Sequence, residues 1–379
     1  MQLPKIASTA TAVIAASLLA CIGAKGEPGE PGPVGQQGPA GPTGPAGSAG
    51  PTGPAGADGQ LRIYGDGSAG ALNITANTNW STAPPAQQNF QFTDLTIATG
   101  FTLTVPSGTV IRVSNNFTNN GAINVLTFET GGTIDLDNTG SNEATYQLPG
   151  KGIARSQAAA GERSFGANQA ASGGRGGTGV ANIVNAGTIL RPGPSGGGGG
   201  AGCLAGTLGN GNGFGGDGGG TLVILAGGNV SNTGTITANG AAASASFPGS
   251  GGGGGGVIVL AARTQVTNTG TINAQGGAGA ASGVSNGAGG GGGGGIVQLI
   301  GPTAANTGTI SVTGGAAGAL GAAGSVTGTS SRMGGAGGGG SGGTGGAGGA
   351  ISSANSPGST GAGGTGFTIV RTIDPTALF

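Results

Sequence analysis

Beyond residue 60 the chain alternates between short runs of aliphatic and β-branched residues and polar turns. Runs of this length, bounded by Asn, Gly and Ser, predict short β-strands rather than helices. The part from residue 61 to residue 125 also contains Trp80 and Tyr64, and five of the ten Phe lie between Phe90 and Phe128. We therefore expect the densest core in this part of the chain.

One strand-turn-strand unit recurs in the second half of the chain. Three copies are clear: TLVILAGGNVSNTGTITANG from Thr221, VIVLAARTQVTNTGTINAQG from Val257 and IVQLIGPTAANTGTISVTGG from Ile296. Separations of 36 and 38 residues relate their turn glycines, Gly234, Gly270 and Gly308. An earlier copy, VIRVSNNFTNNGAINV, has its turn at Asn120 and Gly121, and a partial copy includes Asn185. Self-similarity at such a period indicates a repeat architecture.

The unit favours a stacked solenoid, because one copy alone cannot bury its apolar row. When copies stack, each strand pairs with its counterpart in the next coil. We expect the turn glycines to adopt the positive φ that a sharp corner needs. A row inside the stack then contains Ile236, Ile272 and Ile310. A hydrogen-bonded ladder at the corner contains Asn232, Asn268 and Asn306.

The pattern NTGTI, followed by Ala and Gly, resembles the repeats of filamentous-haemagglutinin-type adhesins. Those adhesins are right-handed parallel β-helices, and the resemblance covers roughly residues 90–315. It implies an all-β fold, a parallel β-helix or solenoid, and an adhesive role. This chain differs from those adhesins in its longer coils and its polyglycine segments.

Glycine-rich segments separate the end of one unit from the strand that begins the next: 191–220, 240–256, 276–295 and 314–366. In a stack, all of them leave at the same corner and lie on one face. Two interpretations remain open, namely mobile loops that keep the surface hydrated and polyglycine-II helices packed side by side, as in the tips of some phage adhesins. A phosphate-binding loop is excluded, because no Lys-Ser or Lys-Thr follows the glycines.

A collagen-like stretch precedes these repeats. From Gly23 to Gly59 glycine recurs at every third residue, with thirteen glycines in phase and Pro at many of the other positions. Only Gly fits at the crowded axis where three polyproline-II chains meet. The stretch resembles the stalks of bacterial collagen-like surface proteins and predicts a homotrimer; the alternative is a single-chain Pro-rich spacer.

The N-terminus has the pattern of an export signal. Lys5 precedes an uncharged apolar run from Ile6 to Ala20, which is too short for a membrane-spanning helix. Its end, Leu-Leu-Ala-Cys, resembles the lipobox of bacterial lipoproteins, in which the cysteine, here Cys21, becomes lipidated. Ile22 after the cysteine implies the outer membrane in that family's sorting pattern. The alternative is ordinary cleavage near Ala24, and the remaining cysteine, Cys203, is expected to be a small buried side chain.

Composition argues against several classes of function. The chain has twelve basic and twelve acidic residues, a net charge of zero and no histidine. Sparse, balanced charge provides no electrostatic surface for nucleic acid. The absence of histidine removes the commonest general base and metal ligand. We therefore expect no enzyme activity, no cofactor and no metal site.

Three further stretches contain charged residues, but none has the pattern of a catalytic or metal site. Asp135, Asp137, Asn138 and Glu143 are similar to a calcium loop, but Tyr146 stands where an EF-hand needs a bidentate acid. Asp66 and Asp217 are lone acids in Gly-rich turns. Residues 151–172 are the one stretch able to form a helix, and we interpret it as a solvated insertion.

These observations predict five segments: a signal peptide at 1–21, a collagen-like stalk at 22–60, the N-terminal β region of a head at 61–150, a Gly-rich insertion at 151–220 and the repeat solenoid at 221–379. The expected function is structural or adhesive display on a bacterial surface through a lipid anchor, with a cell-surface or extracellular-matrix ligand that the sequence does not identify. The alternatives are a polysaccharide-acting β-helix enzyme and a phage-like fibre or receptor-binding protein.

Overall fold

The computed structural model describes residues 63–127, 203–204, 215–244, 249–283, 287–321, 332–333, 337, 339–349 and 360–378. For residues 203–204, 332–333 and 377–378 the description covers the backbone alone. The chain divides into two compact units, Met1–Pro54 and Ala55–Phe379, and every described residue belongs to the second. The signal peptide, Cys21, the collagen-like residues 23–59 and the helix-capable residues 151–172 lie outside the described residues.

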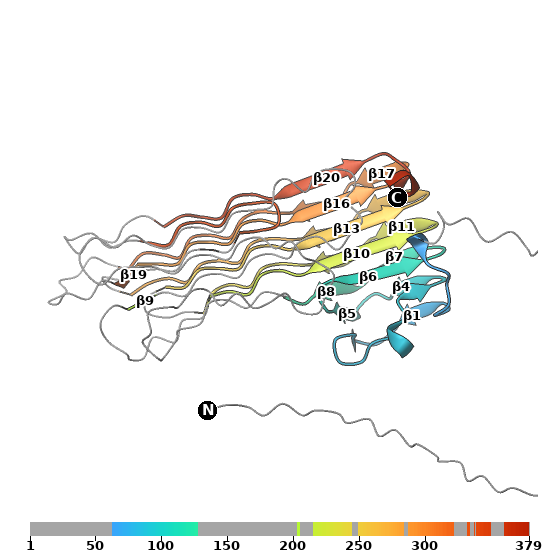
Figure 1. Cartoon of the computed structure of the whole chain (residues 1–379), viewed down its shortest axis with the longest axis horizontal. Coiled ribbons are helices and arrows are strands. Elements are labelled where there is room, and N and C mark those ends of the chain that lie inside the picture. Colours follow the sequence, from blue (N-terminus) through green and yellow to red (C-terminus); the bar gives the residue numbers. More distant parts are fainter. Residues whose placement is uncertain are drawn as a thin grey trace, which may run out of the picture. The chain divides into compact units, whose positions relative to one another are not determined.

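Three parallel six-stranded sheets make up the described part of the head (Figure 1). Sheet A consists of β1 (Leu72–Ile74), β4 (Leu95–Ile97), β7 (Phe117–Asn119), β11 (Asn229–Asn232), β14 (Gln265–Asn268) and β17 (Thr303–Asn306). Sheet B consists of β2 (Thr78–Asn79), β5 (Thr102–Val105), β8 (Ala122–Val125), β12 (Thr235–Thr237), β15 (Thr271–Asn273) and β18 (Thr309–Ser311). Sheet C consists of β3 (Gln91–Phe92), β6 (Thr109–Val113), β10 (Thr221–Ala226), β13 (Val257–Ala262), β16 (Ile296–Ile300) and β20 (Phe367–Arg371).

The chain visits the sheets in the fixed order A, B, C and does so six times. Each strand pairs in parallel with its counterpart in the next coil, which is the construction of a β-solenoid. The register offset is 23 residues between β1 and β4, where Leu72 faces Leu95, and 36 residues between β11 and β14, where Val230 faces Val266. The difference arises between sheets B and C, where the later coils contain the glycine-rich segments.

The solenoid has three strands per coil, whereas the sequence predicts two. The chain bends at Gly227 and Gly228, so what reads as one strand divides into β10 and β11. The coils also begin earlier and end later than residues 90–315, since β1 starts at Leu72 and β20 ends at Arg371. All three sheets continue across the segment between β8 and β10, which joins the N-terminal β region and the repeats into one stack.

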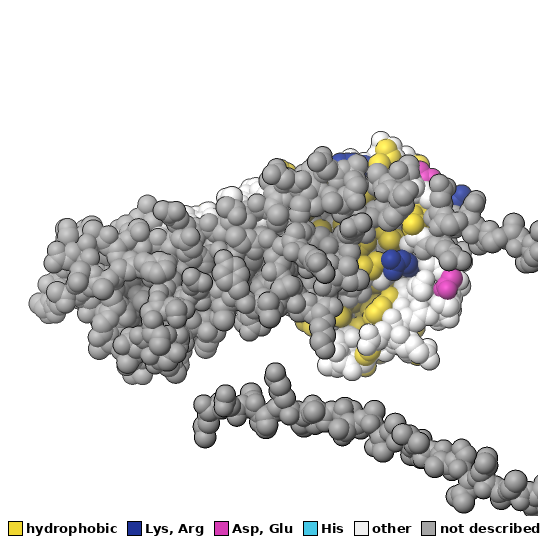
Figure 2. All heavy atoms as spheres, in the orientation of Figure 1, with side chains coloured by type: hydrophobic (Ala, Val, Ile, Leu, Met, Phe, Trp, Pro, Cys, Tyr) yellow, Lys and Arg dark blue, Asp and Glu magenta, His cyan; other side chains and the backbone are white. Residues whose placement is uncertain are grey.

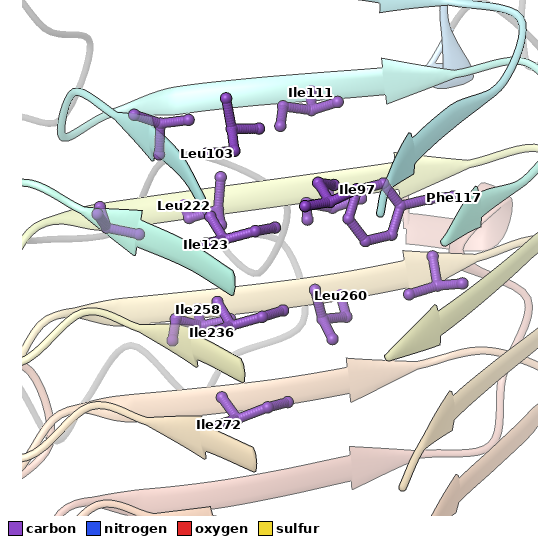
Figure 3. Packing of buried hydrophobic residues seen from close by; sticks show 14 of the residues in the cluster. Ile97, Leu103, Ile111, Phe117, Ile123, Leu222, Ile236, Ile258, Leu260 and Ile272 are labelled. Atoms are coloured by element: carbon purple, nitrogen blue, oxygen red, sulfur yellow. The ribbon is translucent and has the colours of Figure 1, made fainter. Parts of the chain in front are cut away.

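The core fills the space enclosed by the three sheets (Figure 3). Alternate residues of a strand point to opposite faces, so each strand contributes one side chain or two to the interior. Figure 3 shows these side chains converging from all three sheets: Ile97 and Phe117 from sheet A, Leu103, Ile123, Ile236 and Ile272 from sheet B, and Ile111, Leu222, Ile258 and Leu260 from sheet C.

Sheet C is buried on both faces in its central strands. Every residue of β10, β13 and β16 is buried, and the outward side chains form a second apolar cluster with Tyr64. On this side of the molecule hydrophobic side chains gather, and few charged groups stand beside them (Figure 2). A continuous apolar run without alternation is typical of a strand covered on both faces, and the sequence of β10 and β13 has that form.

The two ends of the stack differ. At the first coil Trp80 is buried and stacks on Phe92, with ring centroids 5.9 Å apart, and tilts against Phe90. At the last coil β17, β18 and β20 each have a partner strand on one side only among the described residues. Large hydrophobic side chains exposed in the described residues belong to this last coil and the residues around it: Leu320, Phe367, Val370 and Ile373.

Small elements complete the described head. Strands β9 (Cys203–Leu204) and β19 (Arg332–Met333) form an antiparallel pair, which places Cys203 opposite Met333. The 3-10 turns include η2 (Ala86–Gln88) and η5 (Pro375–Leu378). Within the described residues no helix has the length and apolar character needed to cross a bilayer.

Candidate binding surfaces

An asparagine ladder runs along the corner between sheets A and B. Asn119 Nδ2 donates to Asn232 Oδ1 at 2.7 Å, Asn232 Nδ2 donates to Asn268 Oδ1 at 2.6 Å, and Asn268 Nδ2 donates to Asn306 Oδ1 at 2.6 Å. The first three amides are fully buried, so these bonds satisfy groups that would otherwise be costly to bury. The structure thus joins Asn232, Asn268 and Asn306 as the repeats predict.

The earliest member of this ladder is Asn119 and not Asn120, which corrects the sequence-based choice. Asn119 is in register with Asn232, while Asn120 occupies the position of Thr233 and accepts a hydrogen bond from the Thr233 hydroxyl at 2.9 Å. The turn reads Asn-Asn-Gly in this coil, and sequence spacing alone does not tell the two asparagines apart. Gly121 is, as expected, the counterpart of Gly234.

We expect Asn268→Ala to lower the free energy of unfolding by about 2–4 kcal/mol, because the ladder amides on both sides of it lose a buried partner. Urea unfolding followed by far-UV circular dichroism measures this loss. Asn229→Ala, on the exposed side of β11, is the matched control and should change stability by less than about 0.5 kcal/mol. Equal effects of the two substitutions would contradict a stabilising ladder.

The turn glycines Gly234, Gly270 and Gly308 are required for a reason other than the one predicted. Among the described glycines positive φ occurs at Gly65, Gly67, Gly70, Gly100 and Gly108, so the turn glycines do not adopt it. A Cβ on Gly270 would instead overlap the carbonyl oxygen of Gly234 one coil below, and Gly308 meets Gly270 in the same way. Close stacking of backbone on backbone excludes side chains at this corner.

The isoleucine row is also in register. Ile236 pairs with Ile272, and Ile272 pairs with Ile310. The first two are fully buried, and Ile310 is half-buried because it lies in the last coil. The row therefore contributes to the core and not to a binding site.

The described glycine-rich segments form an ordered, hydrogen-bonded bundle beyond the sheets, which we call the glycine bundle. Its B segments continue from sheet B (238–244, 274–283 and 312–321), and its C segments lead into sheet C (215–220, 249–256, 287–295 and 360–366). Every third amide of a segment donates to the same neighbour, as when Gly249, Gly252 and Gly255 donate to Gly287, Gly290 and Gly293. A period of three, without strand or helix assignment, is the pattern of polyglycine-II helices packed side by side.

The order of the bundle decides between the two interpretations for these segments. All the described segments connect sheet B to sheet C, so they leave the solenoid at one corner as predicted. In Figure 1 the C segments run alongside one another as extensions of β10, β13, β16 and β20. Packed polyglycine-II helices, rather than mobile loops, account for the described residues.

Segments 249–256 and 287–295 are nearly pure glycine because neighbours surround them. A Cβ on Gly292 would point at residue Gly253, one on Gly293 at Gly343, and one on Gly294 at Val312, which are three different segments. No direction is left for a side chain. The B segments have one free direction, and there the sequence places side chains, with Ala242, Ala278 and Ala316 exposed.

An open hollow of about 580 Å³ lies beside the first coil. It is lined by the outer edge of β1, by Trp80 and by the loop that contains Pro84 and Pro85, and its lining includes no charged side chain. Gln87 and Gln88 in this loop have φ of 50° and 53°, a left-handed conformation that costs energy in a non-glycine residue. Apart from the aromatic residues Trp80 and Phe92, no pattern in the sequence predicts this hollow.

Tyr64, near the start of the described head, contacts Thr376, near its C-terminal end. Its ring is buried against sheet C, and its hydroxyl lies 3.4 Å from Thr376 Oγ1, which also bonds to Asp374. Burial raises the pKa of the Tyr64 phenol, and the hydrogen bond to Thr376 opposes this in part. A phenol pKa raised on folding means that the folded state holds its proton more tightly than the unfolded state.

Stability should therefore fall as the pH rises from about 10, where an unfolded tyrosine ionises, through the higher pKa of folded Tyr64. Melting temperatures of the wild type and of Tyr64→Phe measure this between about pH 8 and 11, the range that brackets tyrosine ionisation. We expect Tyr64→Phe to flatten the alkaline decrease. An unchanged decrease in Tyr64→Phe would contradict a buried, neutral phenol.

Other predicted sites lie outside the described residues, namely Cys21 and the Asp135–Glu143 motif. Within the described residues His, Cys, Asp and Glu form no group of three that could bind a metal ion.

The fold of the described head is that of a parallel β-solenoid with a glycine bundle. Comparisons with protein-family models, with curated proteins and with solved structures find no match for the chain. The similarity to adhesin repeats therefore rests on the repeat motifs alone.

Proposed function

We propose that this chain is a non-enzymatic surface protein that displays a rigid β-solenoid head for structural or adhesive purposes. The observation that carries the proposal is that the solenoid and the glycine bundle form one continuous hydrogen-bonded body. Register is kept from the sheets into the bundle, since Gly256 and Gly295 hydrogen-bond to the segments that follow β12 and β15. Such a body repeats the same surface groups at each coil, which suits contact with an extended or repetitive partner.

The stalk and the anchor belong to the same proposal. Residues 23–59 form a collagen-like homotrimer, and Cys21 carries the lipid that holds the protein in the outer membrane. Three heads on one stalk bind a surface through several sites at once, so modest contacts add up to firm attachment.

Mass spectrometry of the mature N-terminus tests the anchor. We expect an acylated Cys21 at the terminus. An unmodified terminus beyond residue 21 would remove the lipid anchor from the proposal.

Sedimentation equilibrium tests the stalk. The wild type should be a trimer, and Gly41→Ala should lower the melting temperature of the triple-helix circular dichroism signal by several degrees, because only Gly fits at the axis. Gln37→Ala, at a position outside the glycine phase, is the matched control and should leave the trimer intact. A monomeric wild type would reduce residues 23–59 to a spacer.

A further inference from the structure

We propose that the outward face of sheet B is an ice-binding surface, which holds water molecules in the arrangement of an ice crystal face. This inference rests on the proposed function, because it gives ice as the surface to which the head adheres. It is carried by two columns of side chains in register across the coils.

The first column flanks the buried isoleucine row. Because side chains alternate along a strand, the burial of Ile236 and Ile272 turns the residues before and after them outward. Strand register places five residues side by side, one in each coil from the second to the sixth, and all are half-buried or exposed: Thr102, Ala122, Thr235, Thr271 and Thr309. Four of the five carry a hydroxyl and a methyl group on the same carbon.

The second column lies two residues further along the same strands. It contains hydroxyl and amide side chains only: Thr104, Asn124, Thr237, Asn273 and Ser311. Neighbouring strands are about 4.8 Å apart, and residues i and i+2 of a strand are about 6.6 Å apart. The two columns therefore form a two-dimensional lattice of polar and methyl groups, and the oxygen atoms on ice faces also repeat at such short spacings in two directions.

The scaffold holds this lattice in place before any ligand arrives. The asparagine ladder borders sheet B on one side, and the glycine bundle continues beyond it on the other, so hydrogen bonds hold its strands in register at both ends. Figure 1 shows successive strands of the stack running alongside one another. A preorganised surface orders water without losing conformational entropy of its own.

The chemistry of the face suits solid water better than other partners. Neither column includes a charged or aromatic residue. Ice excludes ions, so a neutral face avoids an unfavourable contact with it. Sugar-binding sites, in contrast, usually contain aromatic side chains, which this face lacks. Among the described residues, no partner accepts from or donates to the hydroxyls of Thr235, Thr271 and Thr309, which leaves them to bind water.

Sheet A provides a matched control face. Its outward residues include one hydroxyl column, Thr96, Thr118, Ser231 and Thr267. The neighbouring column contains Asn229, Gln265 and Thr303, which differ in length and shape. A single regular column does not form a lattice in two directions.

The experiment measures thermal hysteresis and incorporation of the fluorescently labelled full chain into a growing ice crystal. We expect the wild type to enter ice and shape its growth, and Thr271→Tyr to reduce the hysteresis by about tenfold, since a tyrosine standing above the plane separates many weak contacts at once. Thr267→Tyr on sheet A should retain the activity. Both positions are half-buried on the outward faces of their sheets. Thermal melts of the two variants verify that the loss of activity in Thr271→Tyr does not come from unfolding.

Three outcomes would overturn the proposal: a wild type excluded from ice, equal activity in Thr271→Tyr and the wild type, or equal loss in the two variants. Binding to crystalline cellulose or chitin that Thr271→Tyr abolishes, without ice activity, would assign the face to a polysaccharide instead. The proposed function is tested separately. A lipidated trimer without ice activity would refute only this inference, and an unlipidated monomer that binds ice would refute only the anchored display.

Discussion

Gly292→Val is expected to destabilise the glycine bundle by about 3 kcal/mol, the upper end of the usual range for overpacking. Its Cβ would overlap the carbonyl oxygen of Gly253, which is backbone and cannot rotate away. Moving the segment breaks the hydrogen bond from the Gly292 amide to the Gly277 oxygen, at 2.9 Å, and the one from the Gly315 amide to the Gly292 oxygen, at 2.7 Å. Amide hydrogen exchange of residues 249–256 and 287–295, read by mass spectrometry, measures the loss of protection.

The exposed position Ala278 is the matched control for this substitution. Ala278→Val adds apolar volume to the same bundle, but the side chain points to solvent and should change protection little. In both variants the far-UV circular dichroism of the sheets should persist, because the core of the three sheets includes only the first residue of each B segment, Ala238, Ala274 and Val312. Protection of the bundle in Gly292→Val equal to that of the wild type would contradict packed polyglycine-II helices.

Trp80→Ala should cost about 3–5 kcal/mol, as expected for the loss of a large buried aromatic side chain. Trp80 is 3% exposed and covers the first coil together with Phe90 and Phe92. Without the indole, water reaches the end of the core and the short strands β2 and β3 lose their support. Urea unfolding followed by circular dichroism measures the effect, since the variant lacks the chain's one tryptophan as a fluorescent probe.

Two further variants place limits on this result. Trp80→Phe should retain more than half of the stability lost in Trp80→Ala, because an aromatic ring still covers the coil. Ala83→Ser, exposed in the same loop, should be neutral within about 0.5 kcal/mol. A neutral Trp80→Ala would show that another group closes this end of the stack.

The repeats predict the parts of the head that recur in register. Ile236 and Ile272 occupy the core, and Asn232, Asn268 and Asn306 form a ladder, because a side chain repeated at a fixed period must meet its copy when coils stack. The third strand per coil was missed, since the bend that creates it involves Gly227-Gly228, Arg263-Thr264 and Gly301-Pro302 in successive coils, and these pairs share no turn signal. The sequence predicts short strands where β1, β2 and β3 lie, but not that they form a coil of the stack, because they are only two or three residues long and show no repeat.

The role of the glycines also lies beyond local sequence reasoning. A glycine run is compatible with freedom of the backbone and with close packing of backbones, and the two differ only in what surrounds the run. Around Gly292, Gly293 and Gly294 three separate segments approach, and those contacts are a property of the assembled bundle. The outward columns of sheet B cannot be predicted from the sequence either, because they depend on the register between coils far apart in the chain.

The asparagine ladder has a direction, since each of its three hydrogen bonds runs from the amide nitrogen of one coil to the amide oxygen of the next coil. Its first oxygen, on Asn119, has no donor among the described residues, and its last amide, on Asn306, is exposed. The amide of Asn306 can therefore donate to the asparagine of a further coil. A duplicated gene segment encoding one coil of 36 or 38 residues would join the ladder at the Asn306 end without altering any coil before it. The length of such a head is thus a quantity that evolution can change in whole coils.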